Sequence, residues 1–158
     1  MSDTTTPEVG AAAPDFSLQN DAGATVALAD FRDKQSVVLY FYPKDDTPGC
    51  TKEACYFRDL SAEFAQKDAV ILGVSPDSVE SHVKFRDKFS LSFPLLADPG
   101  AEVARRYGVW KERSMYGKTF MGVERTTFVI GKDGTLRKVF PKVSVEGHAE
   151  EVLAALDA

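Results

Sequence analysis

The chain has 158 residues, 44% of them hydrophobic, and a formal net charge of -5. This length fits one domain with a substantial core. The acidic balance disfavours nucleic acids and anionic membranes as partners, because both attract basic surfaces. No segment approaches the roughly 20 apolar residues of a membrane span. The start of the chain also lacks the basic and apolar regions of a secretory signal. We therefore expect a cytoplasmic protein that binds neither nucleic acid nor membrane.

The hydrophobic pattern predicts strands alternating with helices. Residues 1–12 have the composition of a loose tail, and residues 13–158 form the single predicted domain. Apolar alternation around a glycine turn predicts an N-terminal β-hairpin in residues 15–28. Runs of β-branched and aromatic residues predict strands, and apolar residues at three- and four-residue spacing predict helices. The other expected strands are 36–42, 69–74, 93–97, 126–130 and 135–140, and the expected helices are 51–66, 78–89, 101–107 and 145–156.

Residues 110–122 separate the last two groups of elements. We interpret them as a long, partly apolar loop, because charged residues and two glycines interrupt the apolar side chains. The overall order predicts an α/β fold with a mixed central sheet and helices on both faces. The sequence contains no internal repeat and no sign of a second domain.

The composition also limits the metal chemistry of the protein. The chain has two cysteines, Cys50 and Cys55, and two histidines, His82 and His148. Two thiols cannot complete a four-thiolate zinc site, and the histidines lie far from them without ligand-like spacing. We therefore expect no metal site. In the cytoplasm, cysteines stay reduced unless they are catalytic or redox-sensing.

Cys50 is the residue most suited to covalent chemistry. It follows Pro48 and Gly49, between the expected strand 36–42 and the expected helix 51–66. The free N–H groups and the positive dipole end of a helix start stabilise a thiolate. Pro48 stiffens the turn, and Gly49 has no side chain to block a substrate. The alternative, a small core residue, is disfavoured because sites of open sheets collect at strand ends.

Two further side chains stand close to Cys50 in sequence. The hydroxyl of Thr47 can cap the helix, bond to the thiolate and a substrate oxygen, or do both. Cys55 is either a core residue or a redox partner of Cys50. On an ideal helix the two Cα atoms would lie about 8.6 Å apart, beyond the roughly 7 Å limit of a disulfide. Either the thiols never bond, or bonding requires the helix start to unwind.

Arg125 immediately precedes the expected strand 126–130. If this strand lies beside 36–42, the guanidinium approaches Cys50, where it favours a thiolate and can bind an oxygen-rich substrate. From spacing alone, however, a solvated arginine at a strand end is the better interpretation. The charged run Lys44-Asp45-Asp46 is typical of solvated surface.

The same residues match a known signature. Pro43-x-x-x-Thr47-x-x-Cys50 resembles the active-site motif of peroxiredoxins, and residues 41–55 (FYPKDDTPGCTKEAC) resemble the bacterioferritin-comigratory-protein, or Q-type, subfamily. The resemblance extends over nearly the whole chain. It implies a thioredoxin-like fold and thiol-dependent reduction of hydrogen peroxide and organic hydroperoxides, with no cofactor.

The resemblance also implies roles for the matched residues. Cys50 corresponds to the thiol that attacks the peroxide, and Cys55 to the resolving thiol of many members of the subfamily. Thr47 and Arg125 correspond to the groups that bind and polarise the peroxide. The residues that support the pocket are Pro43, which shields it, Gly49, and Glu53, which helps to orient the arginine.

A resolving thiol within the chain favours a monomer, recycled by thioredoxin or a similar dithiol reductant. Two other functions are compatible with parts of the pattern. A thioredoxin-type disulfide oxidoreductase would share the fold, but it needs two residues between its cysteines, and here there are four. A non-catalytic binding protein would use the apolar residues of 115–121 to hold clients.

Overall fold

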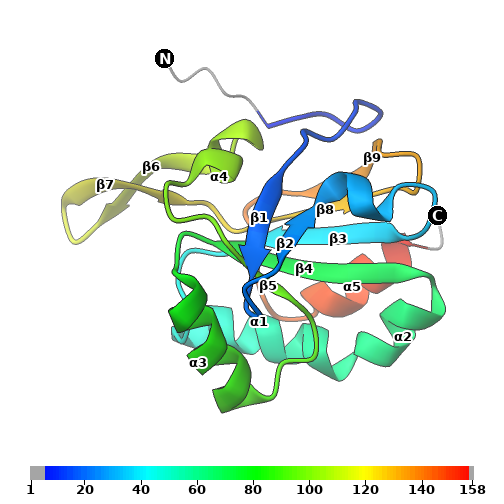
Figure 1. Cartoon of the computed structure of the whole chain (residues 1–158). Coiled ribbons are helices and arrows are strands. Elements are labelled where there is room, and N and C mark those ends of the chain that lie inside the picture. The colour runs from blue at the N-terminus through cyan, green and yellow to red at the C-terminus, as the bar shows by residue number, and fades with distance from the viewer. Residues whose placement is uncertain (1–5, 157–158) are drawn as a thin grey trace.

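A seven-stranded mixed sheet organises the residues that the computed structural model describes, 6–156, with the side chain of Met115 left out (Figure 1). β3, β4 and β5 run parallel, and the other neighbours are antiparallel. The predicted mixed sheet and N-terminal hairpin are confirmed. In spatial order the strands are β2 (Thr25–Ala27), β1 (Ser17–Asn20), β5 (Leu95–Ala97), β4 (Ala69–Ser75), β3 (Ser36–Phe41), β8 (Thr126–Ile130) and β9 (Leu136–Phe140).

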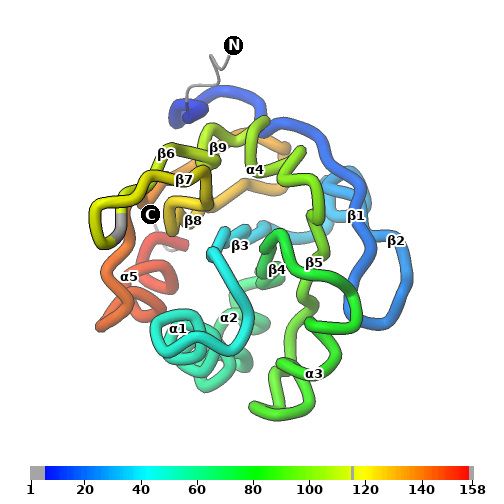
Figure 2. The backbone as a smooth tube through the Cα atoms, turned by 90° about the vertical axis from the view of Figure 1, so that its left-hand side faces the viewer, coloured from blue at the N-terminus to red at the C-terminus, as the bar shows by residue number. Residues whose placement is uncertain are grey.

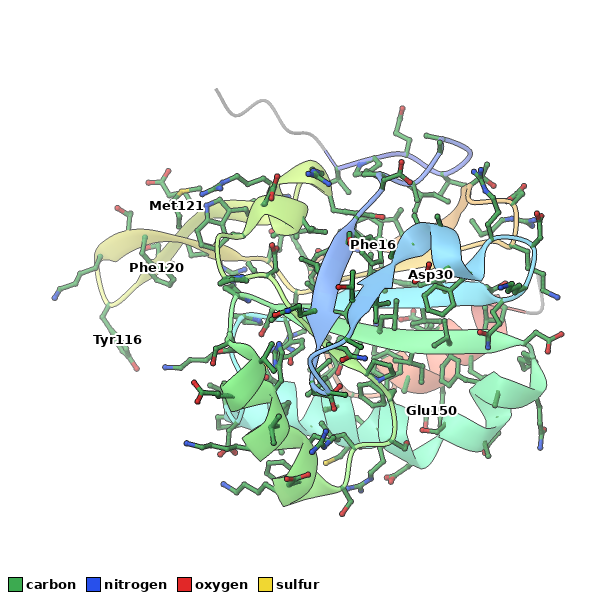
Figure 3. All side chains as sticks on the ribbon, in the orientation of Figure 1. Phe16, Asp30, Tyr116, Phe120, Met121 and Glu150 are labelled. Atoms are coloured by element: carbon green, nitrogen blue, oxygen red, sulfur yellow. The ribbon has the colours of Figure 1, made fainter. Side chains whose placement is uncertain are left out.

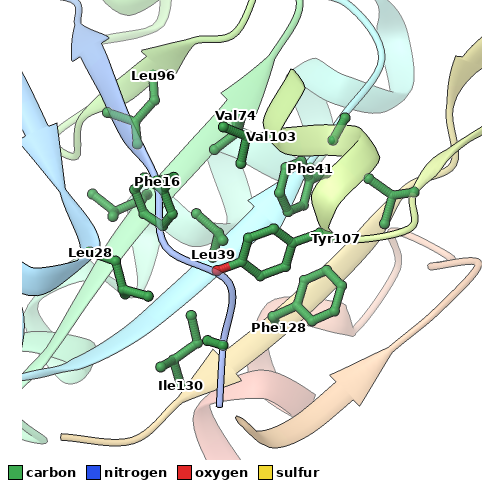
Figure 4. Close-up of a cluster of buried hydrophobic side chains, with 14 of the residues drawn as sticks. Phe16, Leu28, Leu39, Phe41, Val74, Leu96, Val103, Tyr107, Phe128 and Ile130 are labelled. Atoms are coloured by element: carbon green, nitrogen blue, oxygen red, sulfur yellow. The ribbon is translucent and has the colours of Figure 1, made fainter. Parts of the chain in front are cut away.

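The central strand β3 divides its side chains between two hydrophobic cores. Val37, Leu39 and Phe41 point into one core, which also holds Tyr107 and Phe128 (Figure 4). Val38 and Tyr40 enter the other core. Because successive side chains of a strand point to opposite faces, a continuous apolar run fits a strand that is covered on both sides.

Helices cover both faces of the sheet, as Figure 2 shows. α4 and the short 3-10 helix η1 cover the Phe41 side, and the remaining helices cover the Tyr40 side. None of the helices within the described residues is long and apolar enough to cross a membrane. The bounds are η1 (Leu28–Phe31), α1 (Pro48–Asp59), α2 (Ser61–Gln66), α3 (Val79–Phe89), α4 (Glu102–Arg106) and α5 (His148–Ala155).

The helix predicted over 51–66 is two helices. α1 begins three residues earlier than expected, and a break at Leu60 separates it from α2. The hydroxyl of Ser61 donates to the carbonyl oxygen of Arg58 at 2.8 Å. A serine hydroxyl that takes a backbone carbonyl in this way competes with the helical hydrogen-bond ladder.

The prediction of a loop over residues 110–122 was wrong. These residues form a β-hairpin, β6 (Trp110–Met115) and β7 (Lys118–Val123), which projects from the body of the domain (Figure 1). Tyr116 and Gly117 make its two-residue turn with φ angles of 53° and 77°. Two positive φ angles match the twist of a tight hairpin.

The predicted tail is partly attached to the sheet. Residues 1–5 lie outside the described residues, as do residues 157–158 at the other end of the predicted domain. Further along, the backbone N–H of Gly10 donates to Leu136 at 2.8 Å, and that of Leu136 donates to Ala11 at 2.9 Å. Backbone pairing with the start of β9 therefore begins before Ala13.

Candidate active site

Cys50 lies in the first turn of α1. Thr47 is the residue that precedes the helix and Pro48 is its first residue, so the helix start expected at residue 51 is three residues earlier. Proline suits this position because its fixed φ is helical and its missing N–H has no partner to lose there. Cys50 is 1% exposed, and its neighbours in the core include Tyr40 and Ala54.

Antiparallel pairing of β3 with β8 brings Arg125 to this helix start. Phe41 at the end of β3 faces Thr126 at the beginning of β8. The Nη2 atom of Arg125 donates to the sulfur of Cys50 at 3.3 Å. The contact that spacing alone left open is therefore present, and the solvated-arginine interpretation was wrong.

Gly49 allows the guanidinium to come this close. A Cβ atom built at Gly49 would lie 3.2 Å from Nη2 of Arg125, tighter than an ordinary van der Waals contact. The missing side chain at Gly49 therefore makes room for the guanidinium. The opening for a substrate stays a prediction.

Glu53 holds the other arm of the guanidinium. Nη1 of Arg125 donates to Oε1 of Glu53 at 2.6 Å, and the glutamate side chain is 1% exposed. Burial raises the pKa of Glu53 to about 7, although the charge and hydrogen bond of Arg125 act in the opposite direction. Burial lowers the pKa of Arg125, but the charges of Glu53 and Cys50 outweigh it and the net direction is upward. The arginine is therefore fixed as a cation that bridges the carboxyl group of Glu53 and the sulfur of Cys50.

Two buried side-chain oxygen atoms lack hydrogen-bond partners. Among the described residues, they are Oε2 of Glu53 and the hydroxyl of Tyr40. A buried carboxylate oxygen without a donor favours the protonated form of the group. This agrees with the direction of the Glu53 shift.

Thr47 does not cap α1 with its side chain. Its hydroxyl donates to the carbonyl oxygen of Lys44 at 2.9 Å, and its own carbonyl accepts from the N–H of Thr51 at 2.8 Å. Since the hydroxyl hydrogen is used within the loop, the oxygen is left to accept a hydrogen bond from another molecule. Pro43 is exposed at the start of the same loop.

A buried polar network that the sequence did not indicate anchors this loop. Asp45 is 7% exposed, so its assignment to solvated surface was wrong. Its carboxylate contacts the Tyr42 hydroxyl at 2.6 Å, the Ser81 hydroxyl at 2.7 Å and Nδ1 of His82 at 2.7 Å. The loop that carries Thr47 is thereby tied to α3. A tyrosine three residues before an aspartate is too common a pattern to have revealed the network.

Cys55 lies on the same continuous helix as Cys50. Both thiols are free, and Cys55 is only partly buried and belongs to neither core. The interpretation of Cys55 as a core residue is therefore not supported. Elsewhere in residues 6–156, no three His, Cys, Asp or Glu side chains gather as metal ligands would.

Comparisons with known proteins agree with this arrangement. Residues 9–139 match the family model described as the AhpC/TSA family. Peroxiredoxin Bcp of Bacillus subtilis is 52% identical over 151 residues, which cover 96% of each chain. The Xanthomonas campestris bacterioferritin comigratory protein, studied for its alkyl peroxide reduction activity, is 41% identical with a TM-score of 0.88 and covers 95% of this chain and 98% of its own. A PrxQ mutant of Xylella fastidiosa has a TM-score of 0.91 at 38% identity, with 97% of both chains covered.

The range of the family match, residues 9–139, includes both cysteines and Arg125. The chain therefore belongs to the AhpC/TSA family and, within it, to the Bcp peroxiredoxins, which confirms the family, the thioredoxin-like fold and the peroxidase class that the sequence resemblance implied.

Proposed function

We propose that the protein reduces hydrogen peroxide and organic hydroperoxides to water or alcohols, with Cys50 as the attacking thiol. The observation that carries the proposal is the guanidinium of Arg125, 3.3 Å from the Cys50 sulfur and held on its other side by Glu53. The alkyl peroxide reduction of the Xanthomonas relative supports the inclusion of organic hydroperoxides.

In the proposed first step, the Cys50 thiolate attacks one peroxide oxygen. The S–O bond forms as the O–O bond breaks, the leaving oxygen takes a proton and departs as water or alcohol, and Cys50 becomes a sulfenic acid. Arg125 stabilises the charge that develops on the oxygens. Thr47 accepts a hydrogen bond from the peroxide O–H, and Pro43 shields the pocket.

In the proposed second step, Cys55 attacks the Cys50 sulfenic acid and releases water. The intact helix α1 holds both cysteines, and five residues of ideal helix separate their Cα atoms by about 8.6 Å, so its first turns must unwind before the sulfurs meet. Thioredoxin or a similar dithiol then reduces the Cys50–Cys55 disulfide by exchange.

Two cysteine variants test these steps. The Cys50→Ser variant should consume no peroxide above the buffer rate in a stopped-flow assay, and retained turnover would exclude Cys50 as the attacking thiol. The Cys55→Ser variant should complete one turnover and then fail to recycle with thioredoxin. Its intact mass should rise by one oxygen, whereas the wild type should lose two hydrogens. Continued recycling would assign resolution to an external thiol.

We also infer a single catalytic domain and a cytoplasmic location. We infer a monomer because the proposed resolving thiol is supplied by the same chain. Light scattering of the reduced and of the oxidised protein tests whether each is a monomer. A dimer in either state would contradict it.

The projecting hairpin favours one second function, the binding of unfolded client proteins. Tyr116 is 95% exposed, Phe120 47% and Met121 50%, and all three lie on this arm (Figure 3). Exposed apolar residues grouped in this way suit the binding of unfolded clients. Protection of a heat-denatured client by the Cys50→Ser variant, lost on replacing Tyr116 and Phe120 by serine, would support that function independently of peroxide turnover.

A further inference from the structure

Residues 141–147, which we call the strap, connect β9 to α5 and pass beside α1 (Figure 2). Hydrogen bonds attach the strap to Arg125, which immediately precedes β8, and attach the residue after the strap to β8 itself. The N–H of Val143 donates to the carbonyl oxygen of Arg125 at 2.9 Å. Just beyond the strap, Nε2 of the buried His148 lies 2.8 Å from the hydroxyl of Thr127 in β8. The strap is thus a neighbour of the active site that is attached to a rigid part of the fold.

One side chain of the strap reaches the solvent face of α1. Oε2 of Glu146 accepts from Nζ of Lys52 at 3.0 Å, and its Oε1 accepts from the hydroxyl of Tyr56 at 2.9 Å. Hydrogen bonds and charge from these partners lower the pKa of Glu146, and Glu146 in turn raises the pKa of Lys52. Lys52 lies between the two cysteines, and Tyr56 directly follows Cys55. Glu146 therefore contacts α1 at one residue between the two thiols and at the residue that follows the second thiol.

We propose that Glu146 is a positioning residue that holds the start of α1 closed and thereby slows formation of the Cys50–Cys55 disulfide. The inference rests on the proposed function, in which that helix start unwinds. Unwinding carries Lys52 away from the strap, and the strap cannot follow because the hydrogen bonds to Arg125 and Thr127 hold it beside the start of β8. The contacts of Glu146 are consequently made in the closed helix and lost in the open one.

The direction of the effect follows from this difference. A contact present only in the closed state lowers the fraction of open helix by its own equilibrium factor. Removing it should raise the rate of disulfide formation by roughly two- to five-fold, the range expected for an exposed ion pair. The attack of Cys50 on peroxide takes place in the closed state, so its rate should not change. A longer-lived sulfenic acid in the wild type also leaves more time for overoxidation to sulfinic acid.

A set of variants separates the two rates. Reduced protein is mixed with one equivalent of hydrogen peroxide and quenched with acid at successive times. Mass spectrometry then measures the mass of the intact protein at each time. The Glu146→Ala variant should gain oxygen as fast as the wild type and then lose it roughly two- to five-fold faster as the disulfide forms. Tyr56→Phe, which removes one contact, should show a smaller acceleration. Glu80→Gln, which removes an exposed charge on α3, is the matched control and should follow the wild type.

Each outcome bears on a different part of the inference. If the wild type forms the disulfide and Glu146→Ala forms it no faster, the strap does not act on α1 and the proposal is overturned while the proposed function stands. If the wild type forms no disulfide, the proposal and the proposed second step are both overturned, while peroxide reduction by Cys50 stands. Amide hydrogen exchange on the reduced proteins gives a second readout that needs no redox step. Residues 50–55 should exchange faster in Glu146→Ala, and equal exchange would also overturn the proposal.

Discussion

Replacing Glu53 with glutamine tests the buried pair behind Cys50 through its effect on stability. Glu53 is 1% exposed, and burial raises its pKa from the ordinary 4.5 to about 7. The folded protein therefore binds this proton more tightly than the unfolded chain does. Between pH 4.5 and about pH 7 the native state holds more protons than the unfolded state, so the free energy of unfolding falls as the pH rises. Glutamine occupies the same volume and has no proton to lose.

The size of the effect follows from the shift. The rise of the Glu53 pKa from 4.5 to about 7 corresponds to roughly 3 kcal/mol, most of which is lost between pH 5 and pH 8. The free energy of unfolding of Glu53→Gln, taken relative to the wild type, should therefore improve by roughly 2–3 kcal/mol over that interval. Any constant cost of weakening the contact with Arg125 cancels in this comparison.

Urea denaturation of the reduced proteins at four pH values between 5 and 8 measures this difference. Glu63→Gln, which removes one exposed negative charge on α2, is the control for the change in net charge. A difference between Glu53→Gln and the wild type that stays constant within about 0.5 kcal/mol would show that Glu53 is ionised throughout and would refute the reasoning.

Three further substitutions examine the same site from its other sides. Arg125→Lys keeps the charge but loses the fork that contacts Cys50 and Glu53 together, so kcat/KM for peroxide should fall about 100-fold in stopped-flow assays; a loss below about twofold would contradict its role. Gly49→Ala should push the guanidinium away, because its Cβ would lie 3.2 Å from Nη2. The Gly49→Ala variant should lose activity about tenfold, while its free energy of unfolding, measured by thermal denaturation, should stay the same or rise by up to about 1 kcal/mol. A variant that is less stable but fully active would contradict this explanation. Phe57→Ala removes a fully buried ring that stacks on Tyr40, and urea denaturation should show a loss of about 3–5 kcal/mol; a cost below about 1 kcal/mol would mean that the core closes around the gap.

The sheet was predictable because its signal is local and strong. The run from Val37 to Tyr42 is apolar at every position, and a strand with two covered faces needs that pattern. The thiol at a helix start was equally visible, since Pro48 and Gly49 mark the turn. By contrast, the contact of Arg125 with Cys50 depends on which strand pairs with β3, and residues 75 positions apart carry no local record of that pairing.

The missed elements lack a hydrophobic pattern for a physical reason. β6 and β7 pair with each other in a two-stranded ladder outside the main sheet, and β7 is exposed over its first four residues. Without a buried face, a strand has no need for apolar alternation, so the usual signal is absent. The turn at Tyr116 and Gly117 was the remaining clue. The assignment of Asp45 to the surface was wrong for a different reason: two of its partners, Ser81 and His82, lie on α3, far from this loop in the sequence.

The composition of α1 limits how far the proposed unwinding can extend. The buried side chains of its first half are Cys50, Glu53 and Ala54, which are small or polar and bury little apolar area. Phe57 in its second half is fully buried and stacks on Tyr40 at a centroid distance of 4.7 Å. Exposing a phenylalanine ring costs roughly 1.5–3 kcal/mol, whereas an alanine costs far less. Opening should therefore stop before Phe57, which frees both cysteines while the rest of the helix remains packed on the sheet.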